Sequence, residues 1–236
     1  MKTFLSLCLL LIVGITDPDT DYLLGRFDPA SDVRFSKLRP EHTSGAALGG
    51  YLRKETYEAF VTMADAAEKE GIRLIIISAT RNFESQKKIW ENKWNGHVRV
   101  EGKNLTSVIN PEERARIILR YSSMPGSSRH HWGTDMDLNS LENSYFETGD
   151  GLRIYEWLTT HAAEYGFCQP YTSKASGRTG YEEEKWHWSY LPLSRPLLDE
   201  YVKNIRYEDI TGFNGSESAE AIGIIGNYVR GISCSR

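Results

Sequence analysis

The sequence has few cysteines and no long apolar run, and both shortages narrow the possible functions. Only three cysteines occur among 236 residues, and Cys8 lies in an apolar N-terminal stretch. The other two, Cys168 and Cys234, cannot complete a four-ligand zinc site, so any zinc must use histidine and carboxylate ligands. A membrane-spanning helix needs roughly 20 apolar residues. No stretch reaches that length, which argues against a transmembrane segment in the mature chain.

The sequence also has no excess of basic over acidic residues. The chain has 28 lysines and arginines against 32 acidic residues, for a net charge of −4. A nucleic-acid-binding surface normally needs a basic excess, so we expect no nucleic-acid partner. Internal repeats and low-complexity linkers are absent as well. With 40% hydrophobic and 25% charged residues, the composition is that of an ordinary globular domain.

The N-terminus is typical of a secretory signal peptide. One lysine precedes an apolar run over residues 4–13, and small and polar residues follow. We therefore predict a signal peptide over residues 1–16 and export to the periplasm or the extracellular cell-wall space. A lipoprotein anchored at Cys8 is the less favoured alternative, because too little signal precedes that residue. In an exported protein Cys168 and Cys234 favour one disulfide between tail and body, although two buried thiols remain possible.

The rest of the chain mixes helices and strands without a regular strand–helix–strand rhythm. Residues 17–50 are turn-rich and predict an extended lead-in, and residues 51–236 predict a single domain with a helical C-terminal tail. Apolar spacing and capping residues predict helices over 51–70, 82–94, 110–121 and 151–166, and strands over 72–78 and 184–193 with a short one after 166. The expected fold class is α+β, with a mostly antiparallel sheet flanked by helices.

Candidate metal ligands fall in two places. None of the six histidines belongs to a His-Glu-x-x-His motif, but "HHWGTDMD" (130–137) and "EEEKWHW" (182–188) each combine histidine with acids. If 134–138 is a strand, Asp135 and Asp137 share one face. In the second stretch His187 lies opposite Trp186 and Trp188, whose face is most simply core. An exposed or hydrogen-bonded histidine is the plainer interpretation of His187 alone.

Three blocks together resemble a known family. "SRHHWGTDMD", "EKWH" and "SATRNFESQ" (78–86) are similar to motifs of the zinc D-alanyl-D-alanine carboxypeptidases of the VanY type, in subfamily B of the M15 metallopeptidases, the LAS-type peptidases. The blocks occur in the family's order and span roughly residues 78–190. The resemblance implies a hedgehog/DD-peptidase-like fold and one Zn²⁺ per chain.

The resemblance also implies roles for single residues. His130, Asp137 and His187 match the zinc ligands, Glu184 matches the general base, and Arg81 matches the arginine that meets the substrate's carbonyl or carboxylate. The implied substrate-binding residues are Arg81, Gln86 and Ser128. Trp186 is added to the candidate substrate-binding residues because it flanks the site, not because of the resemblance. This chain departs from the family pattern where Ala-Thr replaces Gly-Tyr before Arg81, where Asn82 replaces serine and where Asp135 replaces alanine.

Some assignments keep alternatives. His131 is expected to support a ligand from behind or to face the substrate, rather than to bind the metal itself. Asp135 either orients His130 or another ligand through a hydrogen bond or is solvated. Strict strand alternation would place Glu183 on the face of His187, but the Glu-x-x-His spacing favours Glu184. Trp186 is either core or part of the pocket wall.

These residue types suit metal-assisted hydrolysis. Zinc lowers the pKa of bound water to about 7, a carboxylate can move its proton to the leaving amine, and arginine stabilises a developing oxyanion or a terminal carboxylate. The expected activity is hydrolysis of the bond before the C-terminal D-alanine of peptidoglycan stem peptides, with D,D- or L,D-specificity left open. The alternatives are an endopeptidase cutting within the stem or cross-bridge, and a non-catalytic cell-wall-binding zinc protein.

Overall fold

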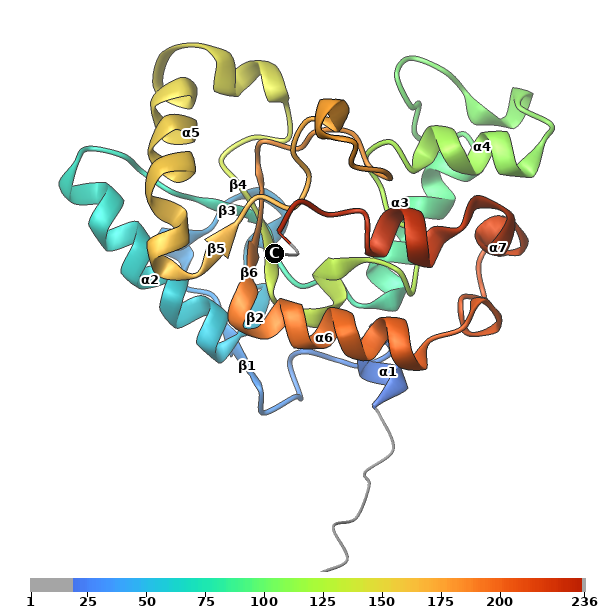
Figure 1. The fold of residues 1–236 in the computed structure, drawn as a ribbon, viewed down its shortest axis with the longest axis horizontal. Coiled ribbons are helices and arrows are strands. Elements are labelled where there is room, and N and C mark those ends of the chain that lie inside the picture. Colours follow the sequence, from blue (N-terminus) through green and yellow to red (C-terminus); the bar gives the residue numbers. More distant parts are fainter. Residues whose placement is uncertain (1–18, 235–236) are drawn as a thin grey trace, which may run out of the picture.

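The computed structural model describes residues 19–234, so the predicted signal peptide lies outside the described residues. A four-stranded antiparallel sheet with strand order β3-β4-β6-β5 forms its centre. A smaller antiparallel pair, β1 and β2, lies beside it (Figure 1). The strands are β1 (Phe35–Lys37), β2 (Tyr51–Arg53), β3 (Ile76–Ser78), β4 (Asp135–Leu138), β5 (Phe167–Cys168) and β6 (His187–Tyr190).

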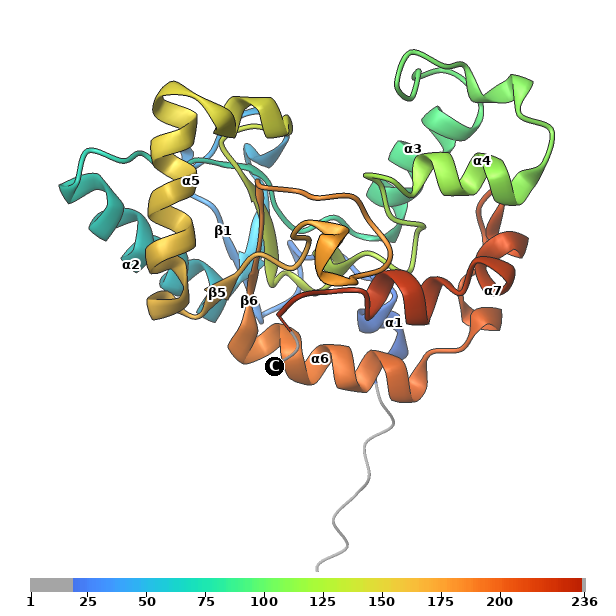
Figure 2. The ribbon, with the colours of Figure 1, turned by 45° about the horizontal axis from the view of Figure 1, so that its top comes forward.

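Helices cover the sheet in two groups, each with its own apolar core. Residues of α2 and α5 pack into one core with the sheet, and residues of α1, α3, α4, α6 and α7 belong to the other. The two groups lie to either side of the sheet in Figures 1 and 2. The helices are α1 (Thr20–Leu23), α2 (Lys54–Lys69), α3 (Phe83–Trp94), α4 (Pro111–Ile118), α5 (Gly149–His161), α6 (Leu191–Asn204), α7 (Ala219–Ile222) and a π-helix (Ile224–Val229). This arrangement is the expected α+β class with an antiparallel sheet flanked by helices.

Alternation along β4 and β6 separates the apolar core from the polar residues of the sheet. Met136 and Trp188 are buried in the core formed with α2 and α5. Asp135, Asp137 and His187 point to the opposite face, as period-two alternation predicts. The register pairs Asp137 with His187 across the two strands. Two stretches about fifty residues apart in sequence therefore present their polar side chains side by side.

The helices over 82–94 and 110–121 begin as their capping residues predict. The Asn82 side chain accepts a hydrogen bond from the Ser85 amide, and Asn110 does the same for Glu113 at the start of α4. Elsewhere the boundaries differ. Only the end of 72–78 is strand, α2 starts after β2 rather than at 51, and the strand predicted over 184–193 is confined to β6. Pro192 in the first turn of α6 suits a helix start and not a continuing strand.

Both ends of the described chain are fixed to the body. The lead-in is not purely extended, because it contains α1 and β1. The Tyr22 hydroxyl donates to the Trp132 carbonyl oxygen over 2.6 Å, between His130 and Asp137 in sequence. Cys168 and Cys234 form a disulfide, with Cα atoms 6.1 Å apart, that joins the tail to β5. Within residues 19–234 no helix has the length and apolar character needed to cross a membrane.

Candidate active site

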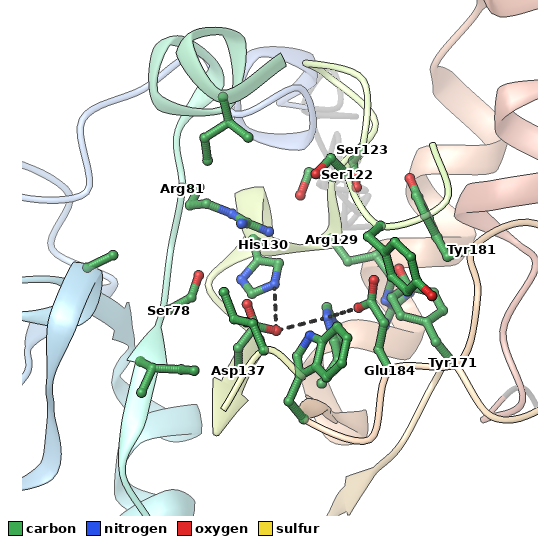
Figure 3. Close-up of a pocket in the computed structure, with 18 of the residues that line it drawn as sticks. Ser78, Arg81, Ser122, Ser123, Arg129, His130, Asp137, Tyr171, Tyr181 and Glu184 are labelled. Carbon is green, nitrogen blue, oxygen red and sulfur yellow. Dashed lines mark ion pairs between the residues drawn. The ribbon is translucent and has the colours of Figure 1, made fainter. Parts of the chain in front are cut away.

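His130, from the turn before β4, comes together with Asp137 and His187 on the polar face of the two central strands, β4 and β6. One ligand atom of each lies within 4.8 Å of the others, and all three residues are buried. His130 Nε2 is 3.4 Å from Asp137 Oδ1, and His187 Nδ1 is 3.2 Å from the same oxygen (Figure 3). His130 Nε2 and Asp137 Oδ1 have no hydrogen-bond partner despite their burial. Two imidazoles and one carboxylate with unpartnered inward atoms fit a catalytic zinc, which takes three protein ligands and keeps one position open.

Gly133 turns the chain between the first two of these residues. His130 lies in a short 3₁₀ turn, Arg129–Trp132, and Asp137 lies in β4. Gly133 caps that turn with φ of 72°, a left-handed conformation that favours glycine. A Cβ atom at this position would lie 2.3 Å from Cε1 of Phe35. The glycine therefore permits both the reversal and the close packing of β1 against it.

A hydrogen bond behind each histidine fixes which nitrogen faces the site. His130 Nδ1 donates to the Ala79 carbonyl oxygen over 2.9 Å, which leaves Nε2 directed at Asp137. His187 Nε2 lies 2.9 Å from Asp135 Oδ1, which leaves Nδ1 for the site. Such outer contacts set the tautomer and orientation of metal-binding histidines. Asp135 therefore orients a ligand through a hydrogen bond, as one of the two alternatives predicted, and that ligand is His187 rather than His130. The alternative of a solvated side chain is wrong.

Arg129 was missed by sequence reasoning and is fully buried beside Asp135. Its Nε donates to Asp135 Oδ1 over 3.0 Å, and its guanidinium also donates to Ser189 Oγ over 2.8 Å. Burial alone would raise the pKa of Asp135, but the charge of Arg129 and the hydrogen bond from His187 outweigh burial and lower it. The sequence contains one signal for this pair: Arg129 precedes His130 in the same block in which Asp135 replaces the family's usual alanine.

Glu184, rather than Glu183, lies at the site. Its Oε2 is 3.3 Å from His187 Nδ1, and the residue is buried. Burial raises the pKa of its carboxyl group, which suits a group that must both take and return a proton. The chain before β6 is a turn in which the His187 amide bonds the Glu184 carbonyl oxygen, so strand parity does not apply there. Choosing the residue by its spacing to His187 was therefore sounder than choosing it by alternation.

A cavity of about 830 Å³ opens onto these residues. Arg81, Ser128 and Trp186 line it, as their assignment to substrate binding requires. Arg81 Nε and Ser128 Oγ are buried without a hydrogen-bond partner, so both have donors available to a ligand. In Figure 3 the Arg81 side chain lies next to His130 at the wall of the cavity.

Two predicted residues lie behind the wall of this cavity. Gln86 does not line it; its Nε2 donates to the Ser123 carbonyl oxygen over 2.8 Å, so it supports the wall instead of touching substrate. His131 does not line it either. Its Nδ1 donates to the Arg81 carbonyl oxygen, and its Nε2 accepts from the Gly126 amide over 3.0 Å. His131 thus connects the Arg81 segment to the turn Arg129–Trp132 that contains His130, and the substrate-facing alternative is wrong.

Other lining residues were not anticipated from the sequence. They come from segments without a recognisable motif: Lys93, Tyr121, Ser122, Ser123, Tyr171 and Tyr181. Lys93 lies on α3, Tyr121, Ser122 and Ser123 precede the turn Arg129–Trp132, and Tyr171 and Tyr181 precede β6. Their positions depend on how these segments pack around the cavity. A sequence pattern with local periodicity carries no information about such packing.

Comparisons with known proteins agree with this geometry. A family model described as VanY, D-alanyl-D-alanine carboxypeptidase, matches residues 49–193. Putative carboxypeptidase YodJ of Bacillus subtilis is 34% identical over 147 residues, covering 60% of this chain and 46% of that protein. A D-alanyl-D-alanine carboxypeptidase of Enterococcus faecalis is 28% identical over 129 residues, covering 55% and 44%. The chain thus matches somewhat under half the length of these curated relatives.

Solved structures share the fold. VanYB in complex with D-alanine-D-alanine superposes with a TM-score of 0.53 at 18% identity, covering 84% of this chain and 87% of that one. A zinc complex of a VanY mutant gives 0.52 at 21% identity, covering 79% and 89%. The family match extends over more than half of the residues and includes all three potential ligands, Glu184 and Arg81. The chain therefore belongs to the VanY family of D-alanyl-D-alanine carboxypeptidases.

Proposed function

We propose that this protein is an exported carboxypeptidase with one zinc ion per chain, and that it hydrolyses the bond before the C-terminal D-alanine of peptidoglycan stem peptides. The observation that carries the proposal is the group of inward-facing atoms of His130, Asp137 and His187 within 4.8 Å, with Glu184 beside them. The E. faecalis relative is named a D-alanyl-D-alanine carboxypeptidase, and the VanYB structure is a complex with D-alanine-D-alanine. The residues of this chain fit that chemistry.

His130, Asp137 and His187 would hold zinc, which supplies Lewis acidity and a lowered pKa for water when bound. Glu184 takes the proton of the attacking water and returns it to the leaving amine. The Arg81 guanidinium donates hydrogen bonds to the oxygen of the attacked carbonyl, where negative charge develops. Ser128 has a free hydroxyl in the same cavity and positions the peptide.

The buried acid argues against a purely binding role. A carboxyl group such as Glu184 loses hydration on burial, which costs free energy that a binding or structural zinc site has no need to spend. Glu184→Gln keeps the shape of the side chain and removes the base. The variant should bind zinc as wild type does and lose about 10²-fold to 10⁴-fold in turnover. Unchanged turnover would exclude Glu184 as the base.

The substrate class is tested by mass spectrometry of defined muropeptides. Wild-type protein with zinc should release D-alanine from pentapeptide or tetrapeptide stems, and a chelator should stop the release. The stem that is shortened identifies D,D- or L,D-specificity. Products shortened by more than D-alanine, or separated cross-links, would indicate the endopeptidase alternative instead. No hydrolysis of any stem with zinc present would refute the proposed function.

Export is part of the proposal and rests on the signal-like residues 1–16 and on the Cys168–Cys234 disulfide. Disulfides persist mainly in oxidising compartments outside the cytosol. N-terminal sequencing of protein recovered from the cell-wall or periplasmic fraction should begin near residue 17. Recovery of the intact N-terminus in the cytosolic fraction alone would contradict export.

A further inference from the structure

Two cationic side chains in the wall of the cavity have no acidic partner among residues 19–234. Arg81 and Lys93 both line the cavity. The Arg81 guanidinium makes no hydrogen bond or ion pair there, and Lys93 Nζ has a single partner, the hydroxyl of Ser122. The acids at the bottom of the cavity, Asp137 and Glu184, are taken up by the ligand cluster. Two further acids, Glu101 and Glu142, line the cavity, and neither forms an ion pair with Arg81 or Lys93. The wall therefore carries two positive charges that form no ion pair among residues 19–234.

Keeping the Lys93 ammonium group charged at this largely buried position costs free energy unless an anion binds beside it. Burial lowers the pKa of its ammonium group, the nearby charge of Arg81 lowers it further, and Glu184 acts in the opposite direction. Removing a charge from water without pairing it disfavours the charged form. Lysine side chains usually avoid this by extending into solvent, yet Lys93 on α3 is directed at Ser122 in the cavity wall. A bound anion would offset the cost.

The Lys93–Ser122 pair has the donors that such an anion needs. An ammonium group has three N–H donors, and only one of them is used on Ser122. Because the Ser122 hydroxyl accepts from Lys93, its own proton is free to be donated. Figure 3 shows Ser122 and Ser123 across the cavity from Asp137, beyond Arg81 and His130. A carboxylate held there would accept from both Lys93 and Ser122.

We propose that Lys93 and Ser122 form the subsite for the free α-carboxylate of the residue that leaves. This inference rests on the proposed function and divides the work between the cations: Lys93 holds the terminal carboxylate, and Arg81 is left for the carbonyl that is attacked. Lys93 and Ser122 line the same cavity as Arg81 and Glu184, so the pair shares that cavity with the reacting centre. The carboxylate of the leaving residue lies only one residue beyond the scissile bond, whereas other carboxylates of a stem lie farther away.

The subsite makes the protein an exopeptidase. An endopeptidase substrate has a neutral amide where a carboxypeptidase substrate has the carboxylate, and an amide cannot balance the charge on Lys93. Since the contact exists both before and during reaction, it should act mainly on KM rather than on kcat. A merely structural role for Lys93 in holding the Ser122 loop would instead affect acid and amide substrates equally.

The test compares free-acid and C-terminal amide forms of acetyl-L-lysyl-D-alanyl-D-alanine and of acetyl-L-lysyl-D-alanine. Wild-type protein with zinc should favour the acid form, and Lys93→Met should reduce the acid-to-amide ratio of kcat/KM by about ten-fold to a hundred-fold. Lys93→Arg should keep most of the preference, and Ser122→Ala should lose part of it. Lys88→Met is the matched control, because it removes an exposed lysine from the same helix, outside the cavity. Its ratio should equal that of wild type.

Binding to chelator-treated protein separates this inference from the proposed function. Calorimetric titration of the acid and amide peptides should show an acid preference in wild type and in Lys88→Met that Lys93→Met loses. If wild type with zinc hydrolyses neither peptide, the proposed function fails, while the titrations still decide the role of Lys93. An acid preference that is absent in wild type, or unchanged in Lys93→Met, overturns the inference. Should Lys93→Met fail to fold, Lys93→Gln replaces it in both measurements.

Discussion

His187 Nε2 donates a hydrogen bond to Oδ1 of Asp135 over 2.9 Å, and this contact leaves Nδ1 of the ring facing Asp137. Asp135→Asn keeps an oxygen acceptor but removes the charge that favours a donating Nε2–H. We expect the zinc affinity to fall by about ten-fold to a hundred-fold, as for other residues that orient metal-binding histidines. Competition with a chromophoric chelator measures the loss.

The same substitution should also destabilise the metal-free protein, because Arg129 is left as an unpaired buried charge. Removing one partner of a buried ion pair costs about 3–5 kcal/mol. Urea unfolding of chelator-treated protein measures the free energy of unfolding. Asp150→Asn is the control, since the Asp150 side chain is 86% exposed. An unchanged zinc affinity in Asp135→Asn would show that His187 does not depend on Asp135.

Gly133→Ala should destabilise the fold through two separate effects. A left-handed conformation costs a non-glycine residue about 1–2 kcal/mol, and the new methyl group would overlap Phe35, which costs about 1–3 kcal/mol more. Gly102→Ala isolates the first effect, because Gly102 has φ of 77° and open space around its missing Cβ. Urea unfolding should show the larger loss in Gly133→Ala. Equal losses would contradict a role for the close packing of Phe35.

His131 should make the stability of the metal-free protein pH-dependent. Burial lowers its pKa from 6.5 to about 3, against the opposite effect of the Arg81 carbonyl oxygen. Between about pH 6.5 and about pH 3, His131 is therefore protonated in the unfolded chain and neutral in the folded chain. The stabilising contribution is complete above about pH 6.5 and is lost as the pH falls toward about 3, at about 1.4 kcal/mol per pH unit.

The measurement is the free energy of unfolding of chelator-treated protein at several pH values below about 6.5. Carboxylates with lowered pKa values add a slope of the same sign, so the informative quantity is the difference between wild type and His131→Gln. The free energy of unfolding of the variant should change less steeply with pH, by the slope that corresponds to about one proton taken up on unfolding. Identical slopes would mean that His131 is protonated in the folded state.

The Cys168–Cys234 disulfide should stabilise the body by closing a long loop. The two cysteines are separated by 66 positions, and constraining such a loop in the unfolded chain is typically worth about 2–4 kcal/mol. The double variant Cys168→Ala, Cys234→Ala should unfold at lower urea concentration than wild type, and wild type in reducing agent should match it. If reduction left the wild-type midpoint unchanged, the tail would be held by its packing alone.

Much of this molecule was predictable because the relevant signals are local. Asn82 and Asn110 mark the starts of α3 and α4 through hydrogen bonds to amides three residues away. The strand alternation that separates Met136 from Asp137 also depends only on neighbouring residues. The boundaries that failed, at 51 and at 191, depend on pairing of β2 with the lead-in and on a proline that starts α6. Those choices involve tertiary partners.

The sequence by itself determined which side chains could bind a metal, and it has a glycine at position 133, between His130 and Asp137. Only the tertiary structure decided how they work together. The register of β4 against β6 brings Asp135 behind His187, a turn before β6 brings Glu184 beside it, and the packing of α3 directs Lys93 into the cavity. The physical reason is that contacts across strands and between distant helices depend on the whole packed core, whereas spacing in sequence specifies only which residues share a face.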